Sequence, residues 1–330
     1  MSLTQPHPLT STPSPLTTLL PHLTPSQLAS LPYPPTLYPG ARDVPTSYGP
    51  MRVYEWGPPT GRKIMLVHGD ATCSPLWARI ANRLVEQGCR VIVFDLWGRG
   101  YTSSPDAPHD ARLLALQLLF AASSSPLPWC ADRFSIVGFS LGGAVSMDFA
   151  AAFPQFVRGV ALLAPVGLLR GLPGSYEELR RAGRDGEMGE EELRGLLRGV
   201  LGVGGEEAAD EVVKNADAVV KWQFEEHEGF ARSFVSTLVC GPLQGQEEVW
   251  RRACGELEER RRERGGRERM VVVCGDEDWV VPAEHVREDL RGMMDEDGFV
   301  FKTVKGGHGF PLDEMACEQV VKALVAEWEL

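Results

Sequence analysis

The sequence lacks the paired cysteines and histidines from which disulfide frameworks and metal sites are built. Its seven cysteines are an odd number and include no Cys-x-x-Cys pair, and its seven histidines do not pair at the spacing of metal ligands. Unpaired thiols are typical of a reducing compartment, so we expect a cytoplasmic protein. We also expect no metal and no cofactor.

Long apolar runs and an excess of basic residues are missing as well. The most apolar helical stretch, Leu113 to Ala122, has about half the length of a membrane span. No basic residue precedes Arg42, and the first residues form no continuous apolar stretch, which argues against a secretory signal. Acidic residues outnumber basic ones, 45 to 33, giving a net charge of -12 that disfavours a nucleic-acid partner. A small-molecule substrate is expected instead, and the oligomeric state is left open.

One short segment carries a specific chemical indication. Gly138–Gly142 reads Gly-Phe-Ser-Leu-Gly; it follows an apolar run and precedes a run of small residues, which predicts a strand, a sharp corner and a helix. A serine at such a corner has strained backbone angles and points its hydroxyl off the carboxyl edge of the sheet. Ser140 is therefore the candidate nucleophile.

A nucleophilic serine requires a histidine base and a carboxylate that orients it, and both are expected downstream in the chain. His308 follows the predicted strand Phe299–Val304, and Asp278 follows the predicted strand Met270–Cys274. Asp276 and Glu277 compete with Asp278 for this role. Asp276 directly follows a glycine and is expected to form the turn, while Asp278 lies further out toward the histidine. The sequence thus predicts Ser140, His308 and Asp278 as the catalytic residues.

Acyl transfer also requires N–H donors for the oxyanion, and two backbone amides are expected to supply them. Leu141 follows the nucleophile at a helix N-terminus, where the helix dipole favours negative charge. Asp70 follows an apolar strand and His68-Gly69, in a turn that fits the second donor. We expect the Asp70 carboxylate to turn away from the pocket and bond the backbone of its own loop.

Strands and helices alternate along the chain, which predicts an α/β fold with a mostly parallel central sheet and helices on both faces. The expected early strands are Met51–Glu55, Lys63–Val67, Arg90–Phe94, Phe134–Val137 and Val157–Leu163. Together with the Ser140 corner, the acid loop, His308, His68-Gly69 and the segment Asp95–Thr102, this order resembles the α/β-hydrolase fold family. The resemblance covers roughly residues 45 to 330 and points to its esterase, lipase and carbon–carbon hydrolase members.

The resemblance also implies the division of the chain. Residues 45–165 and 246–330 are expected to form the hydrolase core, and residues 166–245, where the alternation breaks, a helical cap over the nucleophile. Residues 1–44, rich in Pro, Thr and Ser, are expected to be a partly flexible leader. The aromatic residues predicted to contact substrate are Trp97, Trp222, Phe230 and Phe234.

These features predict a serine hydrolase that acts on a carboxylic ester, thioester or lactone of a small to medium apolar molecule. A carbon–carbon bond hydrolase and an acyltransferase use the same residues and remain alternatives. A binding protein with the same fold but no catalysis is disfavoured, because it has no need of the three catalytic residue types. Ser140 argues against epoxide and haloalkane hydrolases, which place aspartate at this corner.

Overall fold

The protein is built around an eight-stranded, mostly parallel sheet. Its computed structural model describes residues 10–185, 189–203 and 211–330. Across the sheet the strand order is β10-β9-β8-β7-β4-β5-β3-β2; β3 runs antiparallel to β5, and β2 runs antiparallel to β3. The strands are β2 (Ala41–Val44), β3 (Met51–Trp56), β4 (Lys63–Val67), β5 (Arg90–Phe94), β7 (Phe134–Phe139), β8 (Val157–Leu163), β9 (Met270–Gly275) and β10 (Phe299–Val304). The predicted α/β fold is confirmed.

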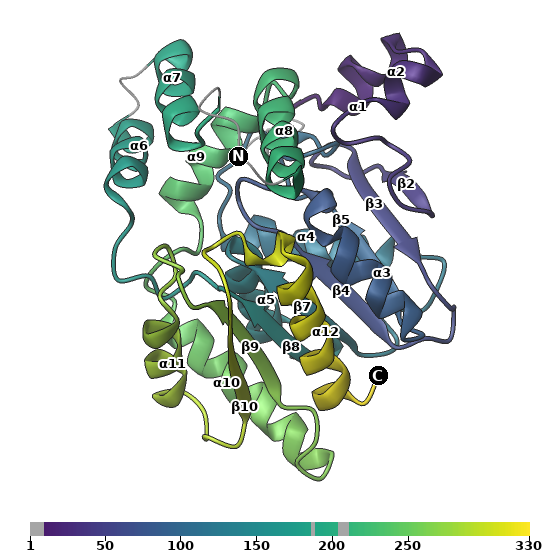
Figure 1. The fold of residues 1–330 in the computed structure, drawn as a ribbon, viewed down its shortest axis with the longest axis vertical. Helices are drawn as coiled ribbons and strands as arrows, with labels where there is room; N and C mark the ends of the chain where they lie inside the picture. The colour runs from purple at the N-terminus through teal and green to yellow at the C-terminus, as the bar shows by residue number, and fades with distance from the viewer. Residues whose placement is uncertain (1–9, 186–188, 204–210) are drawn as a thin grey trace, which may run out of the picture.

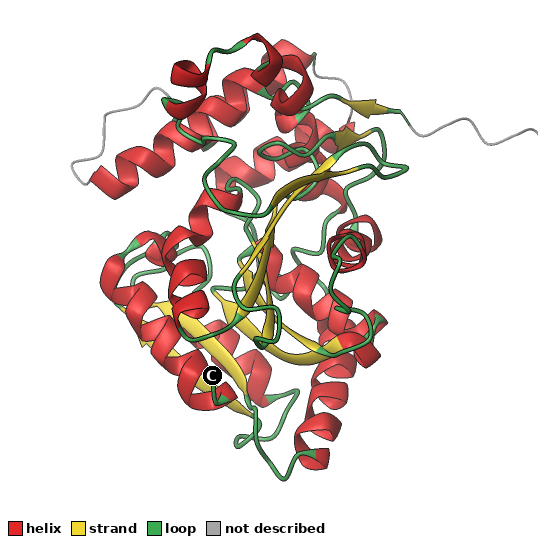
Figure 2. Cartoon of the chain, turned by 90° about the vertical axis from the view of Figure 1, so that its right-hand side faces the viewer, coloured by secondary structure: helices red, strands yellow, loops and turns green. Residues whose placement is uncertain are grey.

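Helices cover both faces of the sheet (Figures 1 and 2). On one face α3 (Ala78–Glu86) packs against α12 (Glu314–Trp328). On the other, α5 (Leu141–Ala152) lies between α4 (Ala111–Ser123) and α10 (Glu247–Glu263). Helix α11 (Ala283–Arg291) connects β9 to β10. In the described parts of the chain, every helix is too short or too polar to cross a bilayer.

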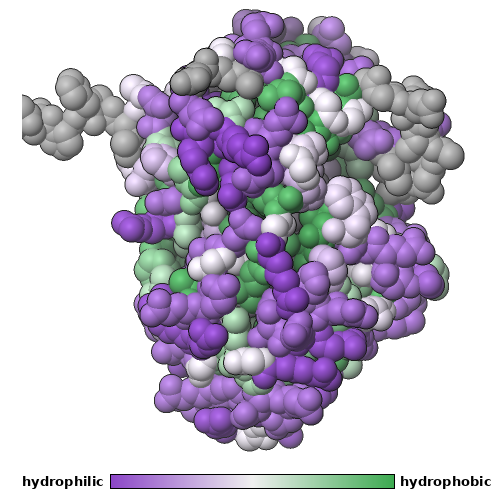
Figure 3. Space-filling model, turned by 90° about the vertical axis from the view of Figure 1, so that its left-hand side faces the viewer, coloured by the Kyte–Doolittle hydropathy of each residue, from purple (hydrophilic) through white to green (hydrophobic). Residues whose placement is uncertain are grey.

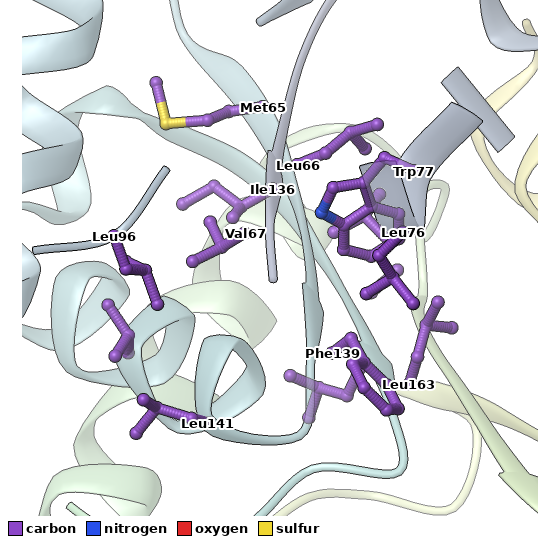
Figure 4. Close-up of a cluster of buried hydrophobic side chains, with 14 of the residues drawn as sticks. Met65, Leu66, Val67, Leu76, Trp77, Leu96, Ile136, Phe139, Leu141 and Leu163 are labelled. Atoms are coloured by element: carbon purple, nitrogen blue, oxygen red, sulfur yellow. The ribbon is translucent and has the colours of Figure 1, made fainter. Parts of the chain in front are cut away.

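The central strands are buried on both faces, which explains why their sequences are almost continuously apolar. Figure 4 shows side chains of β4, β7, β8 and the start of α5 packed together, among them Val67, Ile136, Leu141 and Leu163. All four are fully buried. The corner between β7 and α5 therefore rests on a closely packed base, which restricts its movement.

A group of helices lies beyond the carboxyl ends of the parallel strands, at the top of Figure 1. In the described residues between β8 and α10, these are α6 (Gly174–Asp185), α7 (Glu190–Val200), α8 (Glu211–Glu226) and α9 (Phe230–Cys240). They occupy the stretch that the sequence assigned to the cap. We refer to these four helices as the cap helices.

Residues 10–44 of the segment expected to be a partly flexible leader contain regular elements that join the rest of the fold; residues 1–9 lie outside the described part. Strand β1 (Ser11–Thr12) pairs with β6 (Ser104–Pro105), and β2 joins the main sheet. Helix α2 (Pro25–Ala29) begins with a capping box in which Thr24 and Gln27 bond each other's backbone amides. These elements are too short to produce a hydrophobic period, so the composition of the segment did not indicate them.

A buried tyrosine fastens this N-terminal segment to the core. Tyr33 is fully buried, and its hydroxyl lies 3.0 Å from Asp95 Oδ2 and 2.9 Å from the Tyr54 hydroxyl. Asp95 also accepts bonds from the backbone N–H of Ser74 and of Tyr101. The carboxylate thus joins the N-terminal segment to the loops after β4 and β5.

One buried carboxyl on α5 should make stability depend on pH. Asp148 is almost fully buried, and burial, opposed by Arg252, raises its pKa to about 7. Between pH 4 and 7 the folded protein holds a proton that the unfolded chain has lost, so this group's contribution to stability falls as pH rises. The free energy of unfolding of Asp148→Asn minus that of wild type should therefore increase by about 4 kcal/mol from pH 4 to pH 8. Urea denaturation at both pH values measures this, and an equal effect at both would contradict it.

Candidate active site

The turn after β7 holds Ser140 in a conformation that few non-glycine residues adopt. Its φ is 52° and its ψ is -116°, and its N–H donates to the Leu163 carbonyl at 2.9 Å. The Val166 N–H donates to the Ser140 carbonyl at 3.1 Å, so the neighbouring β8 end holds the turn on both sides. Gly142 permits the tight passage into α5, because a Cβ there would lie 2.0 Å from the Val67 carbonyl oxygen.

The structure brings Ser140, His308 and Asp278 together in a continuous hydrogen-bonded chain. Ser140 Oγ lies 3.0 Å from His308 Nε2, and His308 Nδ1 lies 2.8 Å from Asp278 Oδ2. The other oxygen of Asp278 accepts bonds at 2.9 Å from the N–H groups of Val280 and Val281. Since the Asp278 side chain is fully buried and each oxygen has a partner, the carboxylate is fixed with one oxygen toward the imidazole.

Asp276, the competing acid, has a different environment. Its Oδ1 accepts a bond from the Gly306 N–H at 3.0 Å, and its Oδ2 lies 2.6 Å from Lys305 Nζ. The Lys305 ammonium, with the Gly306 amide, holds the pKa of Asp276 below its usual range. Asp276 therefore ties the end of β9 to the loop after β10, while Asp278 faces the histidine.

The loop after β4 lies directly against the nucleophile. A Cβ at Gly69 would stand 3.2 Å from Ser140 Cβ, which places the neighbouring Asp70 at the site. His68 anchors this loop: its Nε2 accepts the Leu96 N–H at 2.9 Å, so its Nδ1–H donates to the Gly69 carbonyl at 2.7 Å. Burial lowers the pKa of His68 to about 3, so the ring is neutral at physiological pH.

Both predicted oxyanion donors, Asp70 and Leu141, line the pocket that contains Ser140 and His308. Leu141 is the first residue of α5, where backbone N–H groups have no acceptor within the helix. Both residues thus border the space around Ser140, while the role of their amides in the reaction stays a prediction.

The Asp70 carboxylate does not bond its own loop, as the sequence suggested, but pairs with the fully buried Arg99. Arg99 Nε donates to the Asp70 carbonyl at 3.1 Å, and Arg99 also donates to Thr237 Oγ1 of α9 at 3.0 Å. Burial raises the pKa of Asp70 to about 6 although Arg99 opposes the shift. Sequence reasoning missed Arg99, and its one sequence signal is an arginine flanked by Gly98 and Gly100.

A cavity of about 190 Å³ opens above Ser140. Its walls are mostly apolar and include Leu172, just before α6, and Tyr176, Phe234 and Leu238 of the cap helices. Figure 3 shows hydrophobic side chains gathered in the middle of one face, between the cap helices at the top and the core below. Of the four aromatic residues predicted to contact substrate, the structure places Phe234 in this cavity.

The other two cap aromatics have structural surroundings, which corrects the prediction. Trp222 packs between Tyr33 and Tyr101, with ring centroids 5.9 and 5.3 Å away. Phe230 is fully buried and packs on Phe234 at 6.1 Å. Neither lines the Ser140 cavity. The helical spacing of Trp222 and Phe230 therefore reflects structural packing and not contact with the Ser140 cavity.

Trp97 is the third correction. It follows a strand end at the predicted edge, but its fully buried ring lies 5.9 Å from Tyr48 and does not line the cavity. Its backbone N–H donates to Gln117 of α4 at 3.0 Å, which fixes the turn in this orientation. The turn after β5 therefore directs the indole ring toward Tyr48, which lies between β2 and β3.

The structure shows neither a disulfide nor a candidate metal cluster in the part of the chain that it describes. All seven cysteines are described, and all are free thiols. Over the described ranges, His, Cys, Asp and Glu side chains form no cluster of three suited to holding a metal ion.

Comparisons with known proteins place this geometry in a family. A family model described as the alpha/beta hydrolase fold matches residues 63–314. The chain is 32% identical over 127 residues to a serine hydrolase-like protein of Danio rerio, which is 38% of each chain. It is 32% identical over 122 residues to Lipase 3 of Moraxella sp. (strain TA144), 36% of each chain.

The chain thus matches less than two-fifths of the length of these curated relatives. A solved structure of a thermophilic esterase from Thermogutta terrifontis has the same fold, with a TM-score of 0.64 and 18% identity over 88% of this chain and 97% of that one. The family model covers well over half of the sequence, including all the residues assembled around Ser140. The chain belongs to the alpha/beta hydrolase fold family.

Proposed function

We propose that the protein is a serine hydrolase that cleaves a carboxylic ester, thioester or lactone through an acyl-enzyme. The observation that carries the proposal is the chain Ser140 Oγ, His308 Nε2, His308 Nδ1 and Asp278 Oδ2, with contacts of 3.0 and 2.8 Å. These contacts are within the reach that general-base activation of a serine requires.

In the proposed reaction, Ser140 Oγ attacks the carbonyl carbon while His308 Nε2 takes its proton. Asp278 keeps the other imidazole proton on Nδ1 and stabilises the charged ring. The N–H groups of Leu141 and Asp70 stabilise the oxyanion, helped by the N-terminus of α5. His308 then gives its proton to the leaving oxygen or sulfur. Water, activated by the same histidine, hydrolyses the acyl-enzyme and restores the Ser140 hydroxyl.

The composition of the cavity supports a neutral, apolar substrate around the bond that breaks. Leucine, valine, phenylalanine and tyrosine side chains dominate its walls, and within the described chain no lysine or arginine lines it. A carbon–carbon hydrolase that takes an acidic substrate would need a cation near the reacting carbonyl to balance that charge. We therefore propose ester-type hydrolysis in preference to carbon–carbon bond hydrolysis.

Labelling with a fluorophosphonate tests the proposed nucleophile. The reagent should label Ser140 alone in the folded protein, and both heat denaturation and Ser140→Ala should prevent labelling. Ser146 is a matched internal control, because its hydroxyl is buried and donates to the Gly142 carbonyl at 2.5 Å. Peptide mass spectrometry locates the label. A label on Ser146, or none in folded protein, would contradict the proposal.

A further inference from the structure

A second, larger cavity of about 420 Å³ lies beside the Ser140 cavity. Its walls come from three parts of the chain: Pro32 and Leu37 of the N-terminal segment, Val219 and its neighbours on α8, and the turns next to α3 and α12. Helix α8 contacts both of these turns, η2 (Ser74–Trp77) and η4 (Phe310–Leu312). In Figure 1, α8 lies above the yellow start of α12, with the purple N-terminal helices beside it.

The two cavities share a wall. Thr72, Leu76 and Leu312 line both of them. Thr72 follows the loop that carries the Asp70 amide, and Leu312 lies four residues after His308. The second cavity therefore lies on the other side of residues that also wall the Ser140 cavity.

The sizes of the two cavities indicate how they could work together. Sites for small organic ligands usually measure about 300–1,000 Å³, and the Ser140 cavity at about 190 Å³ is smaller than that. The second cavity, at about 420 Å³, lies within this range by itself. A substrate larger than the first cavity has a larger, mainly apolar space available across the shared wall.

The chemistry of the second cavity favours an uncharged occupant. Arg79 is its one charged lining residue among those described, and it already donates to the Leu312 carbonyl and pairs with Glu314 at 2.7 Å. The remaining walls are mainly proline, leucine, valine and alanine side chains. Tyr33, bonded to Asp95, holds Pro32 beside this space, so the N-terminal segment has a defined place in it.

We propose that the second cavity binds an extended apolar arm of the substrate, so that the enzyme acts on esters with a medium-length to long aliphatic chain. The inference rests on the proposed serine hydrolase function and adds the substrate class to it. The apolar arm belongs either to the acyl group or to the alcohol of the ester, and the experiment below distinguishes these two cases.

Filling the second cavity from α8 tests the proposal. Ala216 lines the cavity, whereas Ala218 does not, and two residues along a helix point about 200° apart. Ala216→Trp should therefore fill the cavity, and Ala218→Trp is the matched control on the same helix. If Ala216→Trp does not fold, Asn215→Trp replaces it, because Asn215 lines the cavity from an exposed position.

Two substrate series are measured below their micelle concentrations: p-nitrophenyl esters with acyl chains of increasing length, and acetates of alcohols of increasing length. In wild type, kcat/KM should rise with length in one series by up to about fourfold per buried methylene. Ala216→Trp should lower the ratio of long to short substrate in that series at least tenfold, and Ala218→Trp should leave the ratio unchanged. The series that responds identifies which side of the ester the cavity takes.

Isothermal titration calorimetry with decan-1-ol gives a second readout, the binding affinity, which does not depend on turnover. Ala216→Trp should weaken its binding at least tenfold, and Ala218→Trp should not. If the esters are hydrolysed but the ratio of kcat/KM for long and short substrates is the same in wild type, Ala216→Trp and Ala218→Trp, the inference is overturned and the proposed function stands. If no ester is hydrolysed and Ser140 is not labelled, the proposed function fails. Equal decanol binding in the three proteins would then overturn the inference as well.

Discussion

Ser140→Ala is expected to lower kcat/KM for p-nitrophenyl acetate by on the order of 10⁴-fold or more. The substitution removes the atom that forms the acyl-enzyme and leaves the Leu141 and Asp70 amides in place. The remaining activity should come from water that attacks the bound ester directly, because the site still binds the substrate. Stopped-flow kinetics should show a burst of p-nitrophenol in wild type when deacylation is slow, and no burst in the variant.

A comparison with Ser140→Gly separates loss of chemistry from loss of fold. Ser140 holds φ at 52° with ψ at -116°, a conformation that strains a residue with a Cβ and suits glycine. Ser140→Ala keeps the Cβ and should melt near the wild-type temperature, whereas Ser140→Gly should be the more stable of the two variants. Both should be inactive. Wild-type turnover in either variant would show that Ser140 is not the nucleophile.

The sequence predicted which side chains come together where each candidate catalytic residue follows a strand. Parallel strands end at a common edge, so Ser140 after β7, Asp278 after β9 and His308 after β10 had to meet once those strands were recognised. The strands themselves were recognisable because burial on both faces requires continuous apolar runs. The choice of Asp278 over Asp276 agrees with the geometry for a local reason, since the residue after Gly275 is used by the turn.

What the sequence could not indicate depends on contacts between distant segments. Nothing near Tyr33 in the chain shows that its hydroxyl meets Asp95, 62 residues away. The pairing of Asp70 with Arg99 likewise joins the turns after two neighbouring strands. The direction of an aromatic side chain is also set by its neighbours, so Trp222 packs on the N-terminal segment although its spacing on α8 suits a pocket-lining residue equally well.

Asp278→Asn is expected to lower kcat on the order of 10⁴-fold with little change in the fold. The cause is the proton on His308. Because Oδ1 of residue 278 accepts the N–H groups of Val280 and Val281, an asparagine must keep its oxygen there and present its NH₂ group to His308 Nδ1. Nδ1 then has to accept, the imidazole proton moves to Nε2, and Nε2 can no longer take the proton of Ser140.

Asp276→Asn is the matched control, two residues away in the same loop. It keeps an oxygen for the Gly306 N–H and loses the ion pair with the exposed Lys305, so kcat should stay within a few-fold of wild type. Steady-state kinetics of both variants on one ester, with melting temperatures measured alongside, make the comparison. Equal losses of kcat would mean that the loop matters only as a scaffold. A large loss confined to Asp276→Asn would assign the imidazole to the other carboxylate and remove Asp278 from the proposed mechanism.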